Sequence, residues 1–188
     1  MRALSIVTGC TLVLSIFAFG IARAQTPYIA VYFDPGYSQE AKDCQGVGVV
    51  DTWYVAAVNF NRYLSGAEFA IQYPPEVTWL VDWPAHPIAI GTTPTGISMG
   101  FPFQQNGYNP VPLCEVELMW NCSECGGPYD DHRVKVVAHP ATGFLGGVDY
   151  PGFNLVPAVG LTASVCFSCA CVPTQDTTWG GVKALYAE

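Results

Sequence analysis

Cysteines are the residues whose spacing most directly suggests chemistry in this sequence. Cys122 and Cys125 form a CxxC pair, and Cys166, Cys169 and Cys171 lie close together near the end of the chain. These sulfurs could form disulfides, or four of them (Cys122, Cys125, Cys166 and Cys169) could bind zinc. Cys122 and Cys125 could also make a redox-active pair. The compartment decides between these chemistries, because thiols outside the cytosol tend to oxidise.

Residues 1–24 have the features of a secretory signal peptide. Arg2 gives a positive start, residues 4–21 are almost wholly apolar, and Ala22-Arg23-Ala24 is a small-x-small cleavage site. An uncleaved membrane anchor and a lipobox-like site at Cys10 are the alternatives, but no positive flank follows the apolar run. Cleavage removes two arginines and one cysteine, so the formal net charge changes from -8 to -10. No membrane span is expected after cleavage.

Export favours disulfides over the other sulfur chemistries. The cysteines left after cleavage are expected to form three bridges and one unpaired thiol: Cys44, Cys114, Cys122, Cys125, Cys166, Cys169 and Cys171. Cys114 points inward in its expected strand, so its bridge should cross the core or join a neighbouring strand. Cys169 and Cys171 lie two apart on an extended chain, near the upper limit of Cα separation for a bridge. We expect disulfides and no cofactor.

A possible nucleophile occurs in Gly96-Ile97-Ser98-Met99-Gly100, which matches the GxSxG pattern of a hydrolase elbow. A triad with Ser98 could draw on three aspartates and two histidines: Asp130, Asp131, Asp149, His132 and His139. The context argues against catalysis, because an elbow must lead into a helix and the prolines that follow Phe101 prevent one. We expect a protein that is not an enzyme, with a secreted hydrolase using Ser98 as the remote alternative.

Aromatic side chains are the best candidates for ligand binding. The chain has five Trp and ten Tyr, and core packing explains many of them. Trp79 and Trp83 lie four residues apart in an expected strand and would point the same way as Val81. If that row faces water, it makes a flat stacking platform for sugar rings, and if it faces inward it is part of the core. A carbohydrate-binding module is therefore the alternative function.

The elements that must position these residues are strands. In segment 111–120, Glu115 and Glu117 alternate with an inward row formed by Cys114, Val116, Leu118 and Trp120. Segments 67–73 and 133–138 alternate in the same way, and turn signals of Gly, Pro and Asn separate further β-branched and aromatic runs. Eight or nine short strands at roughly ten-residue spacing predict an all-β fold, a two-sheet antiparallel β-sandwich over residues 25–172.

Composition excludes several classes of protein. Hydrophobic residues make up 51% of the chain and charged residues 12%, which excludes an intrinsically disordered chain. The 19 Gly and 15 Pro argue against long helices. The acidic net charge argues against a nucleic-acid partner, because little in the chain could neutralise phosphates.

The end of the chain differs from the sandwich. Residues 173–188 comprise a spacer and a short tail that could begin a helix capped by Asp176 or Thr177. One face of that helix would combine four apolar side chains: Trp179, Val182, Leu185 and Tyr186. A tail this short is marginal alone, so we expect it to dock, in the simplest case on its own domain.

Residues 28–171 resemble the cohesin-like or immunoglobulin-like sandwich of uncharacterised exported bacterial proteins. The matching pieces are an opening AVYFDP strand, Cys44 before a long strand ending in VAAVNF, and Gly66-Ala67-Glu68-Phe69 at the start of the next strand. The tail is similar to a TTWGxxKxLY motif that often follows such domains. The resemblance implies a non-catalytic surface, matrix or adhesion protein that is secreted, on the cell surface or in the periplasm. Its partner would be a protein or glycan, and its tail a sorting or docking signal.

Overall fold

The structure, a computed structural model, describes residues 25–121 and 132–165 and shows an all-β domain. Those residues form thirteen strands and no helix, and so contain no helix with the length and hydropathy of a membrane span. The strands are β1 (Tyr28–Tyr32), β2 (Ala41–Lys42), β3 (Val50–Val58), β4 (Tyr63–Gln72), β5 (Val77–Pro84), β6 (Ile88–Thr92), β7 (Gly96–Asn106), β8 (Val111–Trp120), β9 (Arg133–Val137), β10 (Gly146–Asp149), β11 (Leu155–Pro157), β12 (Val159–Gly160) and β13 (Thr162–Val165). The expected signal peptide and helical tail lie outside the described residues.

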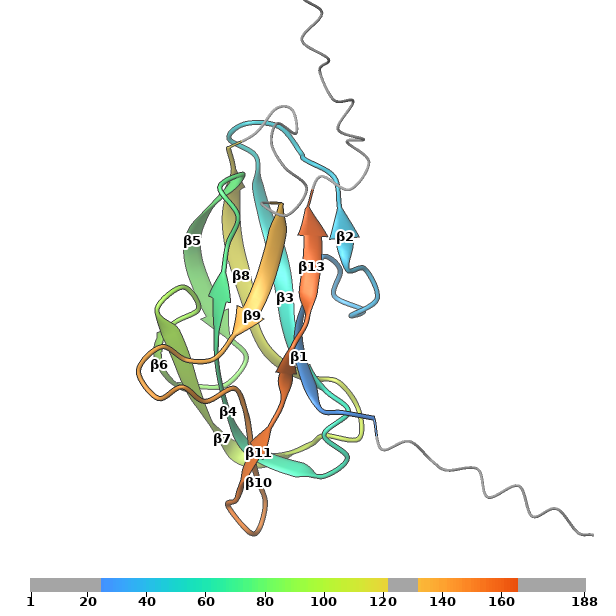
Figure 1. Cartoon of the computed structure of the whole chain (residues 1–188), viewed down its shortest axis with the longest axis vertical. Helices are drawn as coiled ribbons and strands as arrows, with labels where there is room; N and C mark the ends of the chain where they lie inside the picture. The colour runs from blue at the N-terminus through green and yellow to red at the C-terminus, as the bar shows by residue number, and fades with distance from the viewer. Residues whose placement is uncertain (1–24, 122–131, 166–188) are drawn as a thin grey trace, which may run out of the picture.

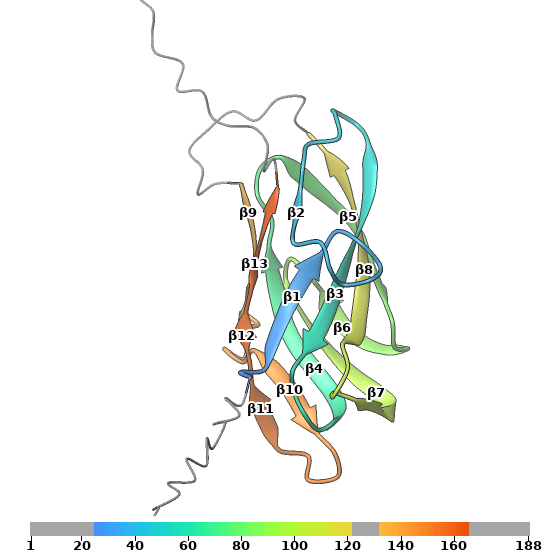
Figure 2. The same ribbon diagram turned by 90° about the vertical axis from the view of Figure 1, so that its right-hand side faces the viewer.

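Two sheets form the sandwich (Figure 1). One has the strand order β12-β1-β3-β8-β5, and the other has the order β11-β10-β4-β9-β13-β2. On the second sheet β7 also pairs with β4, and β6 pairs with β7. Figure 2 shows β9 and β13 on one side of the molecule and β5 and β8 on the other. The predicted two-sheet sandwich is confirmed, although two of its strand pairs, β1–β12 and β13–β2, are parallel rather than antiparallel.

The last described segment joins the two sheets along one edge. β11 pairs with β10 in the second sheet, β12 pairs with β1 in the first, and β13 returns to β9. The backbone N–H of Leu161 donates to the carbonyl of Ile29 at 3.0 Å. A Cβ at Gly160 would lie 1.9 Å from the carbonyl oxygen of Val136, so only glycine fits the crossing. This edge closes the sandwich, and because the segment switches sheets it breaks into more strands than the sequence indicates.

The alternation expected from the sequence is present in the strands. Cys114, Val116, Leu118 and Trp120 of β8 are buried, whereas Glu115 is exposed. β4 and β9 alternate in the same way, with Phe69 and Ile71 of β4 and Val134 and Val136 of β9 buried in the core. Burying each such side chain stabilises the fold by about 1.5–3 kcal/mol, so the pattern determines which face of each sheet turns inward.

A half-buried carboxylate organises the aromatic part of the core. The indole N–H groups of Trp53 and Trp120 donate to Asp51 Oδ2 at 3.0 and 3.3 Å, and the two rings meet edge to face with centroids 5.9 Å apart. Lys42 Nζ lies 2.7 Å from the same carboxylate oxygen. We call Asp51, Lys42, Trp53 and Trp120 the Asp51 cluster. Because Lys42 belongs to β2 and Trp120 to β8, the cluster attaches the short edge strand β2 to the first sheet.

Candidate functional site

The outer face of the second sheet carries an apolar row that contains two glycines. Cross-strand pairing aligns this row over β6, β7, β4, β10 and β11, in the order Ile88, Gly100, Gly66, Val148 and Leu155. The neighbouring residues Ala67, Met99 and Ala89 pack into the core. Because successive residues of a strand point to opposite faces, the row faces away from the core.

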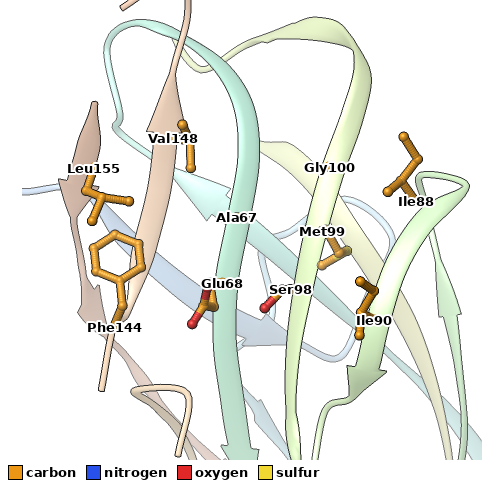
Figure 3. A pocket seen from close by; sticks show the side chains of 10 residues that line it. All are labelled: Ala67, Glu68, Ile88, Ile90, Ser98, Met99, Gly100, Phe144, Val148 and Leu155. Carbon is orange, nitrogen blue, oxygen red and sulfur yellow. The ribbon is translucent and has the colours of Figure 1, made fainter. Parts of the chain in front are cut away.

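A groove that includes Gly100 lies beside this row, between two apolar walls (Figure 3). Ile88 and Ile90 of the β6–β7 side form one wall, and Phe144, Val148 and Leu155 form the other. The groove has a volume of about 260 Å³. Ile90 is 76% exposed, which is unusual for an isoleucine in a strand. We call this feature the glycine groove.

Local packing favours glycine at Gly100 of the groove and at Gly66 opposite it on β4. A Cβ at Gly66 would lie 2.7 Å from the carbonyl oxygen of Met99, so a side chain there would force the backbone to move. A Cβ at Gly100 would lie 3.3 Å from the Cγ2 atom of Ile88, so it would press on the wall. The open floor is thus a consequence of close strand packing, and it exposes the walls to a ligand.

One end of the glycine groove is polar. Glu68 and Ser98 lie opposite each other on β4 and β7, and Thr142 Oγ1 donates a hydrogen bond to Glu68 Oε1. His139 Nδ1 lies 3.9 Å from that carboxylate oxygen and accepts a hydrogen bond from the backbone N–H of Ala141 at 3.2 Å. Since Nδ1 accepts this hydrogen bond, it has no proton to donate to the Glu68 carboxylate. A carboxylate therefore marks one end of an otherwise apolar groove.

The surroundings of Ser98 differ from those of a hydrolase nucleophile. Ser98 lies in the middle of strand β7 and not at a turn from a strand into a helix. In a serine triad the histidine Nδ1–H donates to the carboxylate, whereas Nδ1 of His139 is an acceptor. In the part of the chain that is described, no hydrogen bond joins Ser98 to His139. This geometry does not supply the base that the reaction needs.

The other acids and bases proposed for a triad lie elsewhere. Asp149 accepts a hydrogen bond from the backbone N–H of Asn154 at 2.7 Å, at the β10–β11 turn. His132 is buried, and its Nδ1 atom lies 2.7 Å from Glu76 Oε1. Asp130 and Asp131 lie outside the described residues. Neither Asp149 nor His132 is among the residues that line the groove around Ser98.

The expected platform of Trp79 and Trp83 does not form, because a β-bulge separates the two rings. The register of β5 on β8 shifts between Trp79 and Val81, so Trp79 pairs with the buried Leu118 and Trp83 pairs with the exposed Glu115. Trp79 packs against the core, and Trp83 is 56% exposed. An uninterrupted strand would have placed both on one face.

A hydrogen-bonded carboxylate holds Trp79 in its inward position. Its indole N–H donates to Asp82 Oδ1 at 3.0 Å, and the backbone N–H and hydroxyl of Thr93 also donate to Asp82, each at 2.7 Å. The Thr93 hydroxyl lies 2.6 Å from the Tyr73 hydroxyl, so these partly buried polar groups form a connected network. Trp79 is therefore a structural residue of β5.

Cys114 does not form the bridge expected for it. It is a free, buried thiol, and its cross-strand partners are Val55 on β3 and Pro84 on β5. Burial raises the pKa of this thiol well above its usual range, so it stays protonated and unreactive. Cys44 is disulfide-bonded. The remaining candidates lie outside the described residues: Cys122, Cys125, Cys166, Cys169 and Cys171.

The zinc alternative falls on residues that are not described, since all four of its cysteines belong to that group. Residues 25–121 and 132–165 contain no group of three or more His, Cys, Asp or Glu side chains placed to hold a metal ion. The tail residues expected to dock also lie beyond the described chain: Trp179, Val182, Leu185 and Tyr186.

Sequence reasoning missed the glycine groove. One signal was present, because Ile88 and Ile90 alternate with Ala89, which makes β6 apolar on both faces. Such a strand should be covered on both faces, yet its outer face is open. Gly66 and Gly100 gave no signal in the sequence, because only the register between β4 and β7 places them opposite each other.

Comparison with known proteins gives matches among solved structures. No family model and no curated protein matches the chain. The cohesin CaCohA2 from Clostridium acetobutylicum is 15% identical, with a TM-score of 0.46, over 76% of this chain and 92% of that one. A type III cohesin module of the ScaE scaffoldin from Ruminococcus flavefaciens is 8% identical, with a TM-score of 0.49, over 79% of this chain and 91% of that one.

A third cohesin, from the Coh-OlpA–Doc918 complex of Clostridium thermocellum, is 9% identical. Its TM-score is 0.48, and the match covers 74% of this chain and 99% of that one. These identities and TM-scores are too low to indicate a binding partner, so a partner has to be inferred from the surface of this chain. The similarity between this chain and cohesin modules is that both have a β-sandwich fold.

Proposed function

We propose that this chain is an exported, non-catalytic module that binds a protein partner through the glycine groove, at the cell surface or in the extracellular matrix. The observation that carries the proposal is the open groove itself, in which exposed aliphatic side chains of β6 and β11 flank a floor that includes Gly100, Ser98 and Glu68. Contiguous exposed apolar surface of this kind marks an interaction site on soluble proteins.

The dimensions of the groove favour a helix as the bound element. Three strand spacings separate the columns of Ile88 and Val148, which is about 14 Å at the usual distance between strands. A helix is about 10 Å across, so its apolar side could lie on the glycine floor between the walls. Small or branched side chains on such a helix would fill the groove.

Charge favours a basic residue at one position of the partner. Glu68 lies at one end of the groove, and the whole chain has a formal net charge of -8. A lysine or arginine near one end of the bound helix would pair with Glu68 and would be attracted by the acidic surface before contact. The partner we propose therefore presents an apolar helical face with a basic residue at one end.

Site-specific crosslinking in the producing cells tests this function. A photo-crosslinking amino acid at Ile90 should attach the exported protein to one defined partner, which mass spectrometry identifies. The same amino acid at Val47, which is 67% exposed and lies outside the groove, is the control. Ile88→Asp should abolish the crosslink from Ile90, whereas Val47→Asp should leave it unchanged.

Two results would contradict this function. Crosslinks of equal yield and pattern from Ile90 and Val47 would mean that contact at the groove is non-specific. A crosslink from Ile90 only to a second copy of this chain, together with a dimer in sedimentation, would mean that the groove serves self-association.

The proposal includes the export and the division of the chain expected from the sequence. Residues 1–24 are removed, residues 25–172 form a disulfide-stabilised sandwich, and residues 173–188 act as a spacer and docking tail. Mass spectrometry of the exported protein should find Gln25 at its start and disulfides among its cysteines. Deletion of residues 174–188 should change localisation or stability, and no effect on secretion, localisation and stability would remove the tail as a signal.

A further inference from the structure

A second surface gathers exposed aromatic side chains at one end of the sandwich. They come from the start of β4, the β7–β8 turn and the β10–β11 turn: Tyr63, Tyr108, Tyr150 and Phe153. We call these four residues the aromatic tip. Figure 1 shows the β10–β11 turn at the lower end of the molecule, away from β2. Tyr108 and Phe153 are 64% and 65% exposed.

The four rings form two neighbouring pairs. Tyr63 and Tyr108 meet edge to face with centroids 6.4 Å apart, and Tyr150 and Phe153 do so with centroids 5.9 Å apart. The backbone N–H of Tyr150 donates to the carbonyl of Tyr63 at 2.9 Å, which joins the two pairs. Because a T-shaped pair covers only part of each ring, ring faces stay open to a ligand.

Backbone hydrogen bonds hold the supporting turns. The N–H of Gly107 donates to the carbonyl of Arg62, and the N–H of Asn61 donates to the carbonyl of Gly107, both at 3.0 Å. The N–H of Phe153 donates to the carbonyl of Asp149 at 3.0 Å. Phe153 has a φ of 53°, which is costly for a bulky residue. The fold thus maintains an aromatic side chain in solvent at a position where glycine would be easier.

Polar side chains on the same turns can both donate and accept hydrogen bonds. Four exposed asparagines lie on them: Asn61, Asn106, Asn109 and Asn154. Arg62 Nη1 lies 3.7 Å from Asp149 Oδ2, so the cation on these turns is already paired with a carboxylate. The surroundings of the aromatic tip are therefore rich in amides and close to neutral.

We propose that the aromatic tip binds a neutral glycan. Sugar rings present flat C–H faces that pack on aromatic rings, and their hydroxyl groups match amides that donate and accept. Anionic glycans are disfavoured because Arg62 is paired and the chain is acidic. A protein helix fits the glycine groove better, since the walls of the groove are mostly aliphatic, whereas the aromatic tip has aromatic rings and amides. This function is independent of the one proposed for the groove.

Binding of the oxidised, full-length exported protein to an array of neutral plant, fungal and bacterial polysaccharides tests the proposal. The best-binding polysaccharide is then used in titrations. Tyr108→Ala and Phe153→Ala should each weaken binding about tenfold, because each removes one stacking surface. Trp83→Ala removes an exposed ring from β5 and should leave affinity unchanged, as should Ile90→Asp in the groove.

Circular dichroism and the thermal midpoint verify that each variant is folded. Binding of wild-type protein to no neutral glycan above the level of heat-unfolded protein would overturn the proposal. Equal binding by wild type and both tip variants would also overturn it. If Tyr108→Ala removes the protein crosslink from Ile90 and no glycan binds, the aromatic tip belongs to the protein interface instead.

Discussion

Aromatic side chains gather in two regions of the sandwich, and they are buried in one region and exposed in the other. In the Asp51 cluster, both indole rings are fully buried and both N–H groups have a carboxylate acceptor. In the aromatic tip, four rings remain exposed on hydrogen-bonded turns. Large rings that are buried and satisfied stabilise the fold, whereas rings held in water contribute little to stability and are available for a ligand.

Truncating one ring in each region should give the largest difference. Trp53→Ala should reduce the free energy of unfolding by about 4 kcal/mol, because it leaves a cavity and removes a hydrogen-bond donor from Asp51. Tyr108→Ala should reduce it by less than about 0.5 kcal/mol, since the ring is mostly in water. Equilibrium unfolding in urea with the disulfides oxidised measures both. Similar losses of unfolding free energy in Trp53→Ala and Tyr108→Ala would contradict the difference between the buried and the exposed aromatic region.

Removing the hydrogen-bond acceptor Asp51 should reduce the free energy of unfolding by less than removing the Trp53 ring. Asp51→Ala leaves two buried indole N–H groups without a partner and leaves Lys42 without its carboxylate, so we expect a loss of about 3 kcal/mol. Glu115→Ala removes an exposed carboxylate from neighbouring strand β8 and is the control. An unfolding free energy as high for Asp51→Ala as for Glu115→Ala would show that the cluster does not depend on its carboxylate.

High pH should weaken the buried core. Burial raises the pKa values of the Cys114 thiol and the Tyr73 phenol above their usual ranges, so the folded state keeps their protons. The unfolded chain releases them above about pH 8.5 for cysteine and about pH 10 for tyrosine. The unfolded state then binds fewer protons, and stability falls as pH rises.

Between pH 8 and pH 10.5, we expect this effect to reduce the free energy of unfolding by about 3 kcal/mol. Cys114→Ala should flatten the dependence measured by urea unfolding at several pH values, even if the cavity lowers stability at every pH. If the free energy of unfolding falls as steeply with pH in Cys114→Ala as in wild type, the Cys114 thiol does not contribute to the pH dependence.

The smallest expected change lies in the aromatic tip. Phe153→Gly relieves a positive φ, so it should raise the free energy of unfolding by up to about 1 kcal/mol, less the lost ring contact with Tyr150. Glycan affinity should fall in the same variant. Thermal unfolding and titration with the polysaccharide measure the two effects. A variant that loses stability would indicate that the ring contributes to packing.

Period-two patterning predicted the sandwich because it determines which face of each strand is buried. Segments 67–73, 111–120 and 133–138 place most of their expected inward residues in the core. The register of β3 on β8 shifts beside Cys114, however, so Leu113 and Cys114 are both buried. The parallel pairing of β1 with β12 gave no local signal. This pairing occurs because the chain switches sheets near Gly160. The requirement for glycine there comes from the close approach of the Val136 carbonyl, which is distant in the sequence.

The candidate sites were harder to predict because they depend on register. One extra residue in β5 turns Trp79 inward and leaves Trp83 outside, and alternation counted along the sequence cannot show a bulge. Cys114 was expected in a bridge because the chain has many cysteines, yet Val55 and Pro84 lie opposite it. The glycine groove and the aromatic tip combine residues from separate strands and turns, so only the assembled sheet reveals them.

The parallel pairing of β1 and β12 has a mechanical consequence. β1 leads into the domain from one end of the molecule and β13 leads out toward the other (Figure 1). Tension between the two chain ends would slide these strands lengthwise past each other and load their hydrogen bonds together instead of one after another. A sandwich with this connectivity is suited to resist pulling along the line that joins its first and last strands.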